Sequence, residues 1–475
     1  MKIKTIFLKY FLSLLTIAFV LSSCSKSFLE KEPYGGLPTD QSILTVEDME
    51  TAVNGTYAKL RSADLYGRTL PLFADELADN VYISESNSNR YLDFFFVIYT
   101  VNNGNARGIW ETAYSAILNA NNVINSSLTG TAEIDQLRGE ALCLRALMYF
   151  ELVKHFSKPY TVDPAAIGVP LILKYDAFLK PKRNTTAEVY AQVQKDLEAA
   201  IPLLTIQKSS GFFSQYAAEA LLARMHQFKG EWADALSTAQ DVIDNSGYTL
   251  LKQNQVSGYW ASNTPRTDGL ETLFEVVFDL VGNAGNDALP YFYDQNGYGD
   301  ALASEALYET YSATDVRRSL ILTSSPTRGD VKVVNKYPNS SQPDLDEFKV
   351  LRLSEVYLIA AEAAYQTGDE PLALDYLNEI ATNRDDTFAG YSSSGADLLD
   401  DILLERRKEL AFEGHRYWDL ARYNLDVERE DLNDNYSSLG APLSIPADNF
   451  RRILPVPQAE LDANPNIRDQ QNAGY

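Results

Sequence analysis

The sequence is poor in residues that commonly carry out chemistry in enzymes, with three histidines and two cysteines among 475 residues. None of the histidines (His155, His226 and His415) stands in the His-Glu-x-x-His spacing that binds catalytic zinc on a helix. The chain also lacks a Gly-x-Ser-x-Gly nucleophile elbow and a glycine-rich phosphate loop. These absences argue against the common zinc hydrolases, serine hydrolases and nucleotide-binding enzymes. We therefore expect a protein that is not an enzyme and needs no cofactor.

Long apolar runs are confined to the N-terminus. Residues 1–23 have the form of a secretory signal, with a basic start and an apolar stretch that is short for a membrane span of ~20 residues. Small residues precede Cys24, as in a bacterial lipobox, so we expect Cys24 to carry lipid and residues 24–38 to form a tether. An ordinary signal peptide followed by a chance cysteine is the alternative. Cys143 then has no disulfide partner, and its apolar surroundings predict a small core residue.

Basic residues are also scarce relative to acidic ones. The chain carries 41 Lys and Arg against 65 Asp and Glu, a formal net charge of −24 at pH 7. Such a charge repels phosphate backbones, so nucleic acid is excluded as an expected partner. The hydrophobic content of 45% is ample for a large core.

Helical periodicity dominates what is present. Apolar residues recur every three or four positions over residues 136–156 and 186–204, which predicts two buried helices. Residues 216–245 and 351–378 each predict a helix, a glycine turn and a second helix. In both segments the glycine is followed five residues later by alanine, which permits close helix crossing, as in tetratricopeptide repeats. The matched spacing favours stacked repeats over generic antiparallel helices.

A loop-rich insertion interrupts the helices at about residues 251–349, which are rich in Gly, Asn, Asp, Pro and Tyr. We expect a mainly α fold, a tetratricopeptide-like scaffold of about four helix pairs at about residues 106–250 and 350–423. The scaffold and the insertion together form a single domain over residues 39–475. Because binding loops are usually carried on rigid scaffolds, the insertion is predicted to form the ligand face.

Several sequence blocks form a recognisable set. Trp110, Tyr114, Ile117 and Asn121 stand in the spacing "W-x-x-x-Y-x-x-I-x-x-x-N", and two further helical blocks cover residues 139–152 and 352–363. The most specific block runs from Glu405 to Leu420. From Cys24 to the final residue, Tyr475, these blocks resemble those of the SusD/RagB family and follow the family order.

The resemblance implies a lipid-anchored, surface-exposed lipoprotein of the outer membrane that binds nutrient. It also implies a partner, a SusC-like TonB-dependent barrel, over which the protein closes as a lid and to which it delivers captured oligosaccharide. A peptide-binding member of the same family and a structural tetratricopeptide interaction module remain alternatives.

Three glutamates near the C-terminus have either a catalytic or a structural role. Glu405, Glu409 and Glu413 recur every four residues and therefore share one face of a predicted helix. A glycosidase needs two carboxylates on opposite sides of a sugar, which one helix face does not provide. Neighbouring arginines instead predict an ion-pair network between helices.

Sugars are bound by stacking on aromatic rings and by hydrogen bonds to amides, carboxylates and arginine, so we sought aromatic residues among such side chains outside the helices. Three clusters predict ten ligand-binding residues: Tyr259 and Trp260; Tyr291, Tyr293 and Asn296; and Asp79, Asn80, Tyr82, Arg90 and Tyr91. Trp260 is the leading candidate, because Trp110, Trp232 and Trp418 all lie in predicted scaffold helices. Trp260→Ala is expected to weaken sugar binding with little effect on the melting temperature.

A metal site is not expected in the second cluster. Asp294, Asn296 and Asp300 resemble part of a calcium loop, but the terminal glutamate of an EF-hand is missing.

Overall fold

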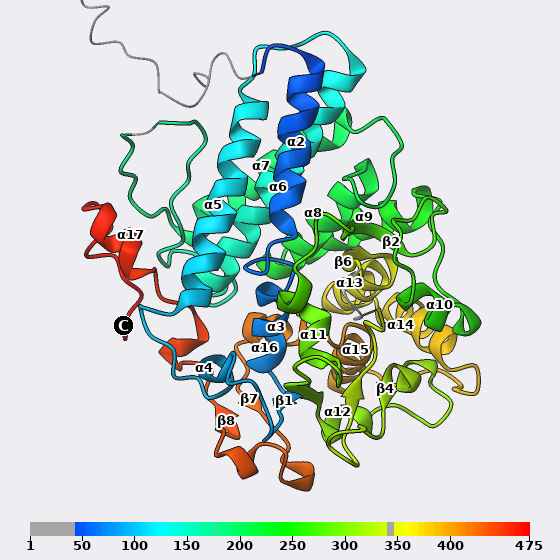
Figure 1. Ribbon diagram of the computed structural model, residues 1–475. Coiled ribbons are helices and arrows are strands. Elements are labelled where there is room, and N and C mark those ends of the chain that lie inside the picture. Colours follow the sequence, from blue (N-terminus) through cyan, green and yellow to red (C-terminus); the bar gives the residue numbers. More distant parts are fainter. Residues whose placement is uncertain (1–42, 177, 340–345) are drawn as a thin grey trace, which may run out of the picture.

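The computed structural model describes residues 43–176, 178–339 and 346–475 (Figure 1). The predicted signal segment, the tether and Cys24 lie outside these residues. Within the described ranges, no helix is both long and apolar enough to cross a membrane.

Four long helices pack side by side in one half of the molecule (Figure 1). They are α2 (Val46–Leu60), α5 (Gly104–Ile124), α6 (Ala132–Phe156) and α7 (Thr186–Ala200), the last followed by the 3-10 turn η3 (Ile201–Leu203). Helix α6 is buried on nearly every side, as its two apolar stripes predict. Cys143 on this helix is unpaired and fully buried, which confirms its predicted place in the core. Thr185 and Glu188 form a capping box that fixes the start of α7.

The predicted helix pairs are present. They are α6 with α7, α8 (Gln215–Lys229) with α9 (Trp232–Asn245), α13 (Leu353–Gln366) with α14 (Glu370–Arg384), and α15 (Ala396–Glu409) with α16 (Arg416–Arg422). Gly230 and Gly368 turn the chain at φ 74° and 88°, values that favour glycine. Ala235 and Ala373 are fully buried at the crossings that follow. The spacing therefore identified the turns and the crossings of the scaffold.

The rest of the chain forms short elements, both in the insertion, as its composition predicts, and in the segments at residues 61–103 and 423–475. The strands pair antiparallel as β1 (Val81–Ile83) with β3 (Ala301–Ala303), β2 (Thr272–Val276) with β6 (Phe348–Arg352), β4 (Ile321–Leu322) with β5 (Val333–Val334), and β7 (Val427–Glu428) with β8 (Ser444–Ile445). The short α-helices are α3 (Thr69–Glu76), α4 (Leu92–Phe95), α10 (Val256–Trp260), α11 (Leu289–Tyr293), α12 (Glu305–Tyr308) and α17 (Gln458–Ala463). The remaining 3-10 turns are η4 (Gln253–Gln255), η5 (Gly285–Asp287), η6 (Val316–Leu320), η7 (Leu432–Asp434), η8 (Ser437–Leu439) and η9 (Phe450–Arg452).

A buried ion-pair network joins the insertion to the helical scaffold through Glu405, Glu409 and Glu413, as predicted. The predicted shared helix face is wrong for Glu413, because α15 ends at Glu409 and the backbone turns at Phe412 with a φ of 66°. Glu409 Oε1 lies 2.9 Å from Arg352 Nη1 and 3.0 Å from Arg384 Nη2. Its Oε2 lies 3.0 Å from Arg317 Nη1. Burial alone would raise the pKa of Glu409, but the three guanidinium groups hold that pKa well below its usual value. The three glutamates therefore form a structural junction.

Candidate functional site

Two loops that lie far apart in the sequence meet at one edge of the molecule. Strand β1 pairs with β3 so that Tyr82 faces Leu302, and this pairing places the loop after β1 beside the segment before β3. The Ser88 backbone N–H donates to Asp300 Oδ1 at 2.9 Å, and the Ser88 hydroxyl hydrogen-bonds to the same carboxylate. Two of the predicted clusters, from residues 79–91 and 291–296, therefore lie next to each other.

Arg328 fastens the two loops together. Its Nη2 donates to Ser86 O at 2.7 Å and to Tyr298 O at 3.0 Å. Its Nη1 donates to Gln295 Oε1 at 2.9 Å, and its Nε donates to Ser84 Oγ at 3.0 Å. A guanidinium with this many fixed partners holds the loops in one arrangement before any ligand arrives.

Side chains gather on the outside of these loops. The Arg90 guanidinium lies 4.1 Å from the centroid of the Tyr298 ring, and Tyr291 packs edge-on against Tyr298 with ring centroids 4.8 Å apart. Arg90 and Asn296 are exposed, whereas Tyr291 and Tyr298 are half-buried. We call this group of Arg90, Tyr291, Asn296 and Tyr298 the Arg90 surface. Tyr82 on β1 is half-buried, and its ring packs edge-on against Tyr436 instead, with centroids 6.2 Å apart.

The chemistry of the Arg90 surface suits a ligand with apolar faces and many hydroxyls. The half-buried tyrosines offer ring area without the entropy cost of ordering long flexible chains. Arg90 supplies hydrogen-bond donors, and Asn296 supplies both donors and acceptors. The geometry therefore fits binding. Of the predicted site residues, Arg90, Tyr291 and Asn296 lie on this surface, whereas Tyr82 packs against Tyr436.

The other leading cluster lies in the core, so the expected exposure of Trp260 is wrong. Trp260 is 4% exposed and Tyr259 is 2% exposed. The Trp260 ring packs edge-on against Tyr337, with ring centroids 5.9 Å apart. Lys336 Nζ lies 4.4 Å from the centroid of the Trp260 ring. The Tyr259 hydroxyl hydrogen-bonds to Thr272 Oγ1 at 2.7 Å. No ring face of this pair is free for stacking, because partners distant in the sequence cover both residues.

Two more predicted residues form contacts inside the fold. Asp79 pairs with Arg416 Nε at 2.8 Å and with Arg407 Nη2 at 3.2 Å. Asn80 is fully buried and accepts a hydrogen bond from Arg407 Nε at 2.9 Å. Both residues connect the start of the early loop to α15 and α16 and therefore serve the fold. Asn80 Nδ2 has no hydrogen-bond partner among the described residues.

The same holds for two predicted aromatic residues. The Tyr91 hydroxyl contacts Arg68 Nε and Thr69 Oγ1, both at 2.6 Å. Tyr293 is 1% exposed, and its hydroxyl donates to Asp75 Oδ2 at 3.3 Å. Burial raises the pKa of Asp75 to about 8, so this carboxyl is largely protonated at neutral pH. Tyr91 packs against Phe292, which in turn contacts Tyr298, whereas Tyr293 packs against Tyr337 and Phe412. Neither buried ring is available to a ligand.

Sequence reasoning missed Arg328, which organises the surface. It lies in a polar turn of the insertion with no aromatic neighbour in the sequence, so no pattern distinguishes it. Its importance depends on partners 30 or more residues away.

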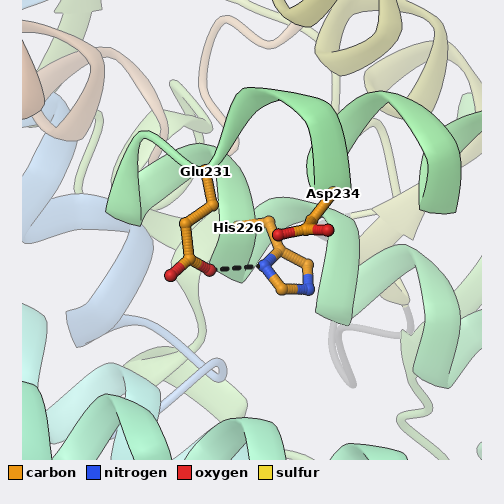
Figure 2. A group of neighbouring side chains, drawn as sticks. All are labelled: His226, Glu231 and Asp234. Atoms are coloured by element: carbon orange, nitrogen blue, oxygen red, sulfur yellow. Dashed lines mark hydrogen bonds and ion pairs between the residues drawn. The ribbon is translucent and has the colours of Figure 1, made fainter.

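One group of side chains in the described residues has the composition of a metal site. Figure 2 shows His226, Glu231 and Asp234 at the turn between α8 and α9, with ligand atoms all within 4.8 Å of one another. Glu231 Oε2 already lies 2.7 Å from His226 Nδ1, and its Oε1 lies 2.5 Å from Lys229 Nζ. The Lys229 ammonium repels a divalent cation here, so we interpret the group as a hydrogen-bonded turn.

Comparisons with known proteins agree with this architecture. Residues 323–475 match a family model described as the SusD family, and residues 27–226 match one described as starch-binding associating with outer membrane. A SusD superfamily protein from Bacteroides thetaiotaomicron is 31% identical, with a TM-score of 0.81 over 90% of this chain and 100% of that chain. One from Bacteroides vulgatus is 29% identical, with a TM-score of 0.83 over 91% and 100%.

A curated relative covers nearly the whole sequence. The SusD-like protein P2 of Formosa agariphila is 27% identical, and the alignment covers 98% of this chain and 100% of the relative. Residues 227–322, which include Tyr291 and Tyr298, lie between the two segments that the family models match.

Proposed function

The chain belongs to the SusD family, and from this membership we propose that it is a cell-surface glycan-binding lipoprotein. It captures oligosaccharides on the Arg90 surface and delivers them to a SusC-like TonB-dependent barrel in the outer membrane. It binds without chemical conversion of the sugar. The Arg90 surface carries this proposal, because it presents aromatic rings beside a guanidinium and an amide.

The structure of the surface supports a rigid platform for sugar. Arg328 fixes both loops, and the tyrosine rings are half-buried, so binding orders few additional side chains. Asp79 at the start of the early loop is neutralised by Arg407 and Arg416, so this carboxylate is not available to a basic peptide. The rings of Tyr291 and Tyr298 beside Arg90 favour a glycan over a peptide.

Isothermal titration of the purified protein against a panel of oligosaccharides and peptides tests the proposal. We expect at least one oligosaccharide to bind, and Tyr291→Ala and Arg90→Ala each to weaken that binding about tenfold, or ~1.4 kcal/mol. Tyr175→Ala and Arg107→Ala are matched controls, because both side chains are exposed elsewhere. Binding of peptides alone, or equal effects of site and control variants, would overturn the proposal.

Lipid anchoring rests on the sequence from Leu21 to Cys24. The family description that names the outer membrane supports it. We expect Cys24→Ser to abolish the incorporation of radiolabelled palmitate into the protein. A variant that still incorporates palmitate would contradict anchoring through this cysteine.

A further inference from the structure

A cavity of about 260 Å³ lies on α16 and the C-terminal end of α6, away from the loops of the Arg90 surface. Its deep wall is formed by buried rings, Tyr417 and Trp418, and its rim includes the exposed residues Lys158 and Val162. Arg452 also lines it, so we call it the Arg452 cavity. The volume is close to the lower limit of ~300 Å³ for small-molecule sites, which fits one sugar ring.

Arg452 is the least satisfied polar group of this cavity. The side chain is 6% exposed, and its Nη1 donates to Leu425 O at 2.6 Å. Its Nη2 has no hydrogen-bond partner among the described residues. A buried guanidinium nitrogen without an acceptor is costly, so an acceptor supplied by a ligand would be strongly favoured.

The charge of the lining is opposite to that of the whole protein. The chain has a net charge of −24, whereas Lys154, Lys158 and Arg452 line this cavity with Asp448 at its rim. Lys154 Nζ already pairs with Glu151 at 2.8 Å, so the positive charge open to a ligand comes from Arg452 and Lys158. The positive charge of the cavity therefore attracts an anion, although the protein as a whole is negatively charged.

The apolar and amide side chains of the lining indicate which kind of anion the cavity binds. Trp418 and Phe450 supply ring surface, and Asn424 and Asn449 supply amides at the cavity. Inorganic anions use neither feature, whereas a sugar ring uses both. Because Arg452 Nη1 already donates to Leu425 O, Nη2 is the nitrogen that remains for a carboxylate oxygen.

We propose that the Arg452 cavity binds a sugar acid, a single pyranose ring whose carboxylate is held by Arg452 and Lys158. The ring lies against Trp418 and Phe450, and the amides receive its hydroxyls. This site is separate from the Arg90 surface and gives the protein a second binding site that is selective for acidic sugar.

Titration of the purified protein with D-glucuronate, with D-glucose as the neutral ring of the same size, tests the assignment. We expect glucuronate to bind at least tenfold more tightly than glucose. Arg452→Gln should weaken glucuronate at least tenfold, and Lys158→Ala should weaken it severalfold. Equal affinities for glucuronate and glucose, or no binding of either, would overturn the proposal.

A second variant, Val162→Trp, tests the same cavity without replacing the buried Arg452. Val162 is an exposed rim residue, so a tryptophan there fills the cavity mouth without removing a charge or a core contact. We expect this variant to lose glucuronate binding while its circular dichroism spectrum stays unchanged. Retained binding in a folded Val162→Trp protein would place the ligand elsewhere and refute the proposal.

Two further measurements test whether the Arg452 cavity recognises the sugar ring and acts independently of the Arg90 surface. Inorganic phosphate should compete with glucuronate at least tenfold less well than unlabelled glucuronate does, and equal competition would show that charge alone is recognised. Arg90→Ala should leave glucuronate affinity unchanged, and Arg452→Gln should leave oligosaccharide affinity unchanged. These two variants therefore test the Arg90 surface and the Arg452 cavity separately, so either proposal can be refuted without the other.

Discussion

Replacing Trp260 by alanine is expected to destabilise the fold without a direct effect on ligand. The ring is 4% exposed, so its truncation leaves a cavity, and comparable substitutions cost ~3–5 kcal/mol. Lys336, Lys349 and Arg352 carry cations 4.4 Å, 5.5 Å and 5.4 Å from the ring centroid. Each of these contacts contributes roughly 0.5–2 kcal/mol when desolvated, so we expect a total loss near the upper end, about 4–5 kcal/mol.

Urea unfolding followed by far-ultraviolet circular dichroism measures this loss. Thermal melting is less sensitive: with ~2.1 cal/mol/K of unfolding entropy per residue, the 475-residue chain loses only about 4 °C for that change. Trp232→Ala is the matched control, because Trp232 is partly exposed on α9 and should lose ~1–2 kcal/mol. A loss below ~1 kcal/mol for Trp260→Ala, together with lost oligosaccharide binding, would refute the placement of Trp260 in the core.

Two further predictions concern buried carboxyl groups. Glu409→Gln should lower the free energy of unfolding in urea by ~3–5 kcal/mol, because three guanidinium groups lose their shared counter-charge. The control Glu111→Gln, at an exposed position on α5, should change it by less than ~0.5 kcal/mol. Equal losses in the two variants would contradict the network. Burial raises the pKa of Asp75 to about 8, above an unfolded value of ~3.9. Its contribution to stability is therefore present at low pH and is lost as the pH rises toward 8, so Asp75→Asn should flatten the fall in stability between about pH 5 and 8. An unchanged pH slope in this variant would show that Asp75 is already ionised in the folded protein.

The helical scaffold was predictable because its determinants are local. Apolar residues at helical spacing mark α6 and α7, and the glycine-to-alanine spacing marks Gly230 with Ala235 and Gly368 with Ala373. Each of these features depends on residues fewer than 30 positions apart, where periodicity and turn chemistry are informative.

The place of Trp260 was not predictable for a different physical reason. Its neighbours in the sequence are polar and irregular, so they give no period from which burial follows. Its cover comes from Lys336 and Tyr337, more than 70 residues later, and from Arg352 on β6. A tertiary contact of this range leaves no trace in a local pattern.

The Arg90 surface was only half predictable. Aromatic and amide residues drew attention to residues 79–91 and 291–296, but as two separate clusters. The two clusters lie together because β1 pairs with β3 and because Arg328 binds both loops. Strands of three residues are too short to be recognised in the sequence. The same residues include Asp79, Asn80, Tyr91 and Tyr293, whose polar atoms serve the fold. Composition finds polar aromatic segments, whereas burial decides which members meet a ligand.

A crystal structure with the tightest-binding oligosaccharide of the panel tests the central claim most directly. Our account predicts a sugar ring against Tyr291 or Tyr298, with hydroxyls bonded to Arg90 or Asn296. The loops fixed by Arg328 should keep their positions on binding. An oligosaccharide bound elsewhere, with the Arg90 surface unoccupied, would contradict the account.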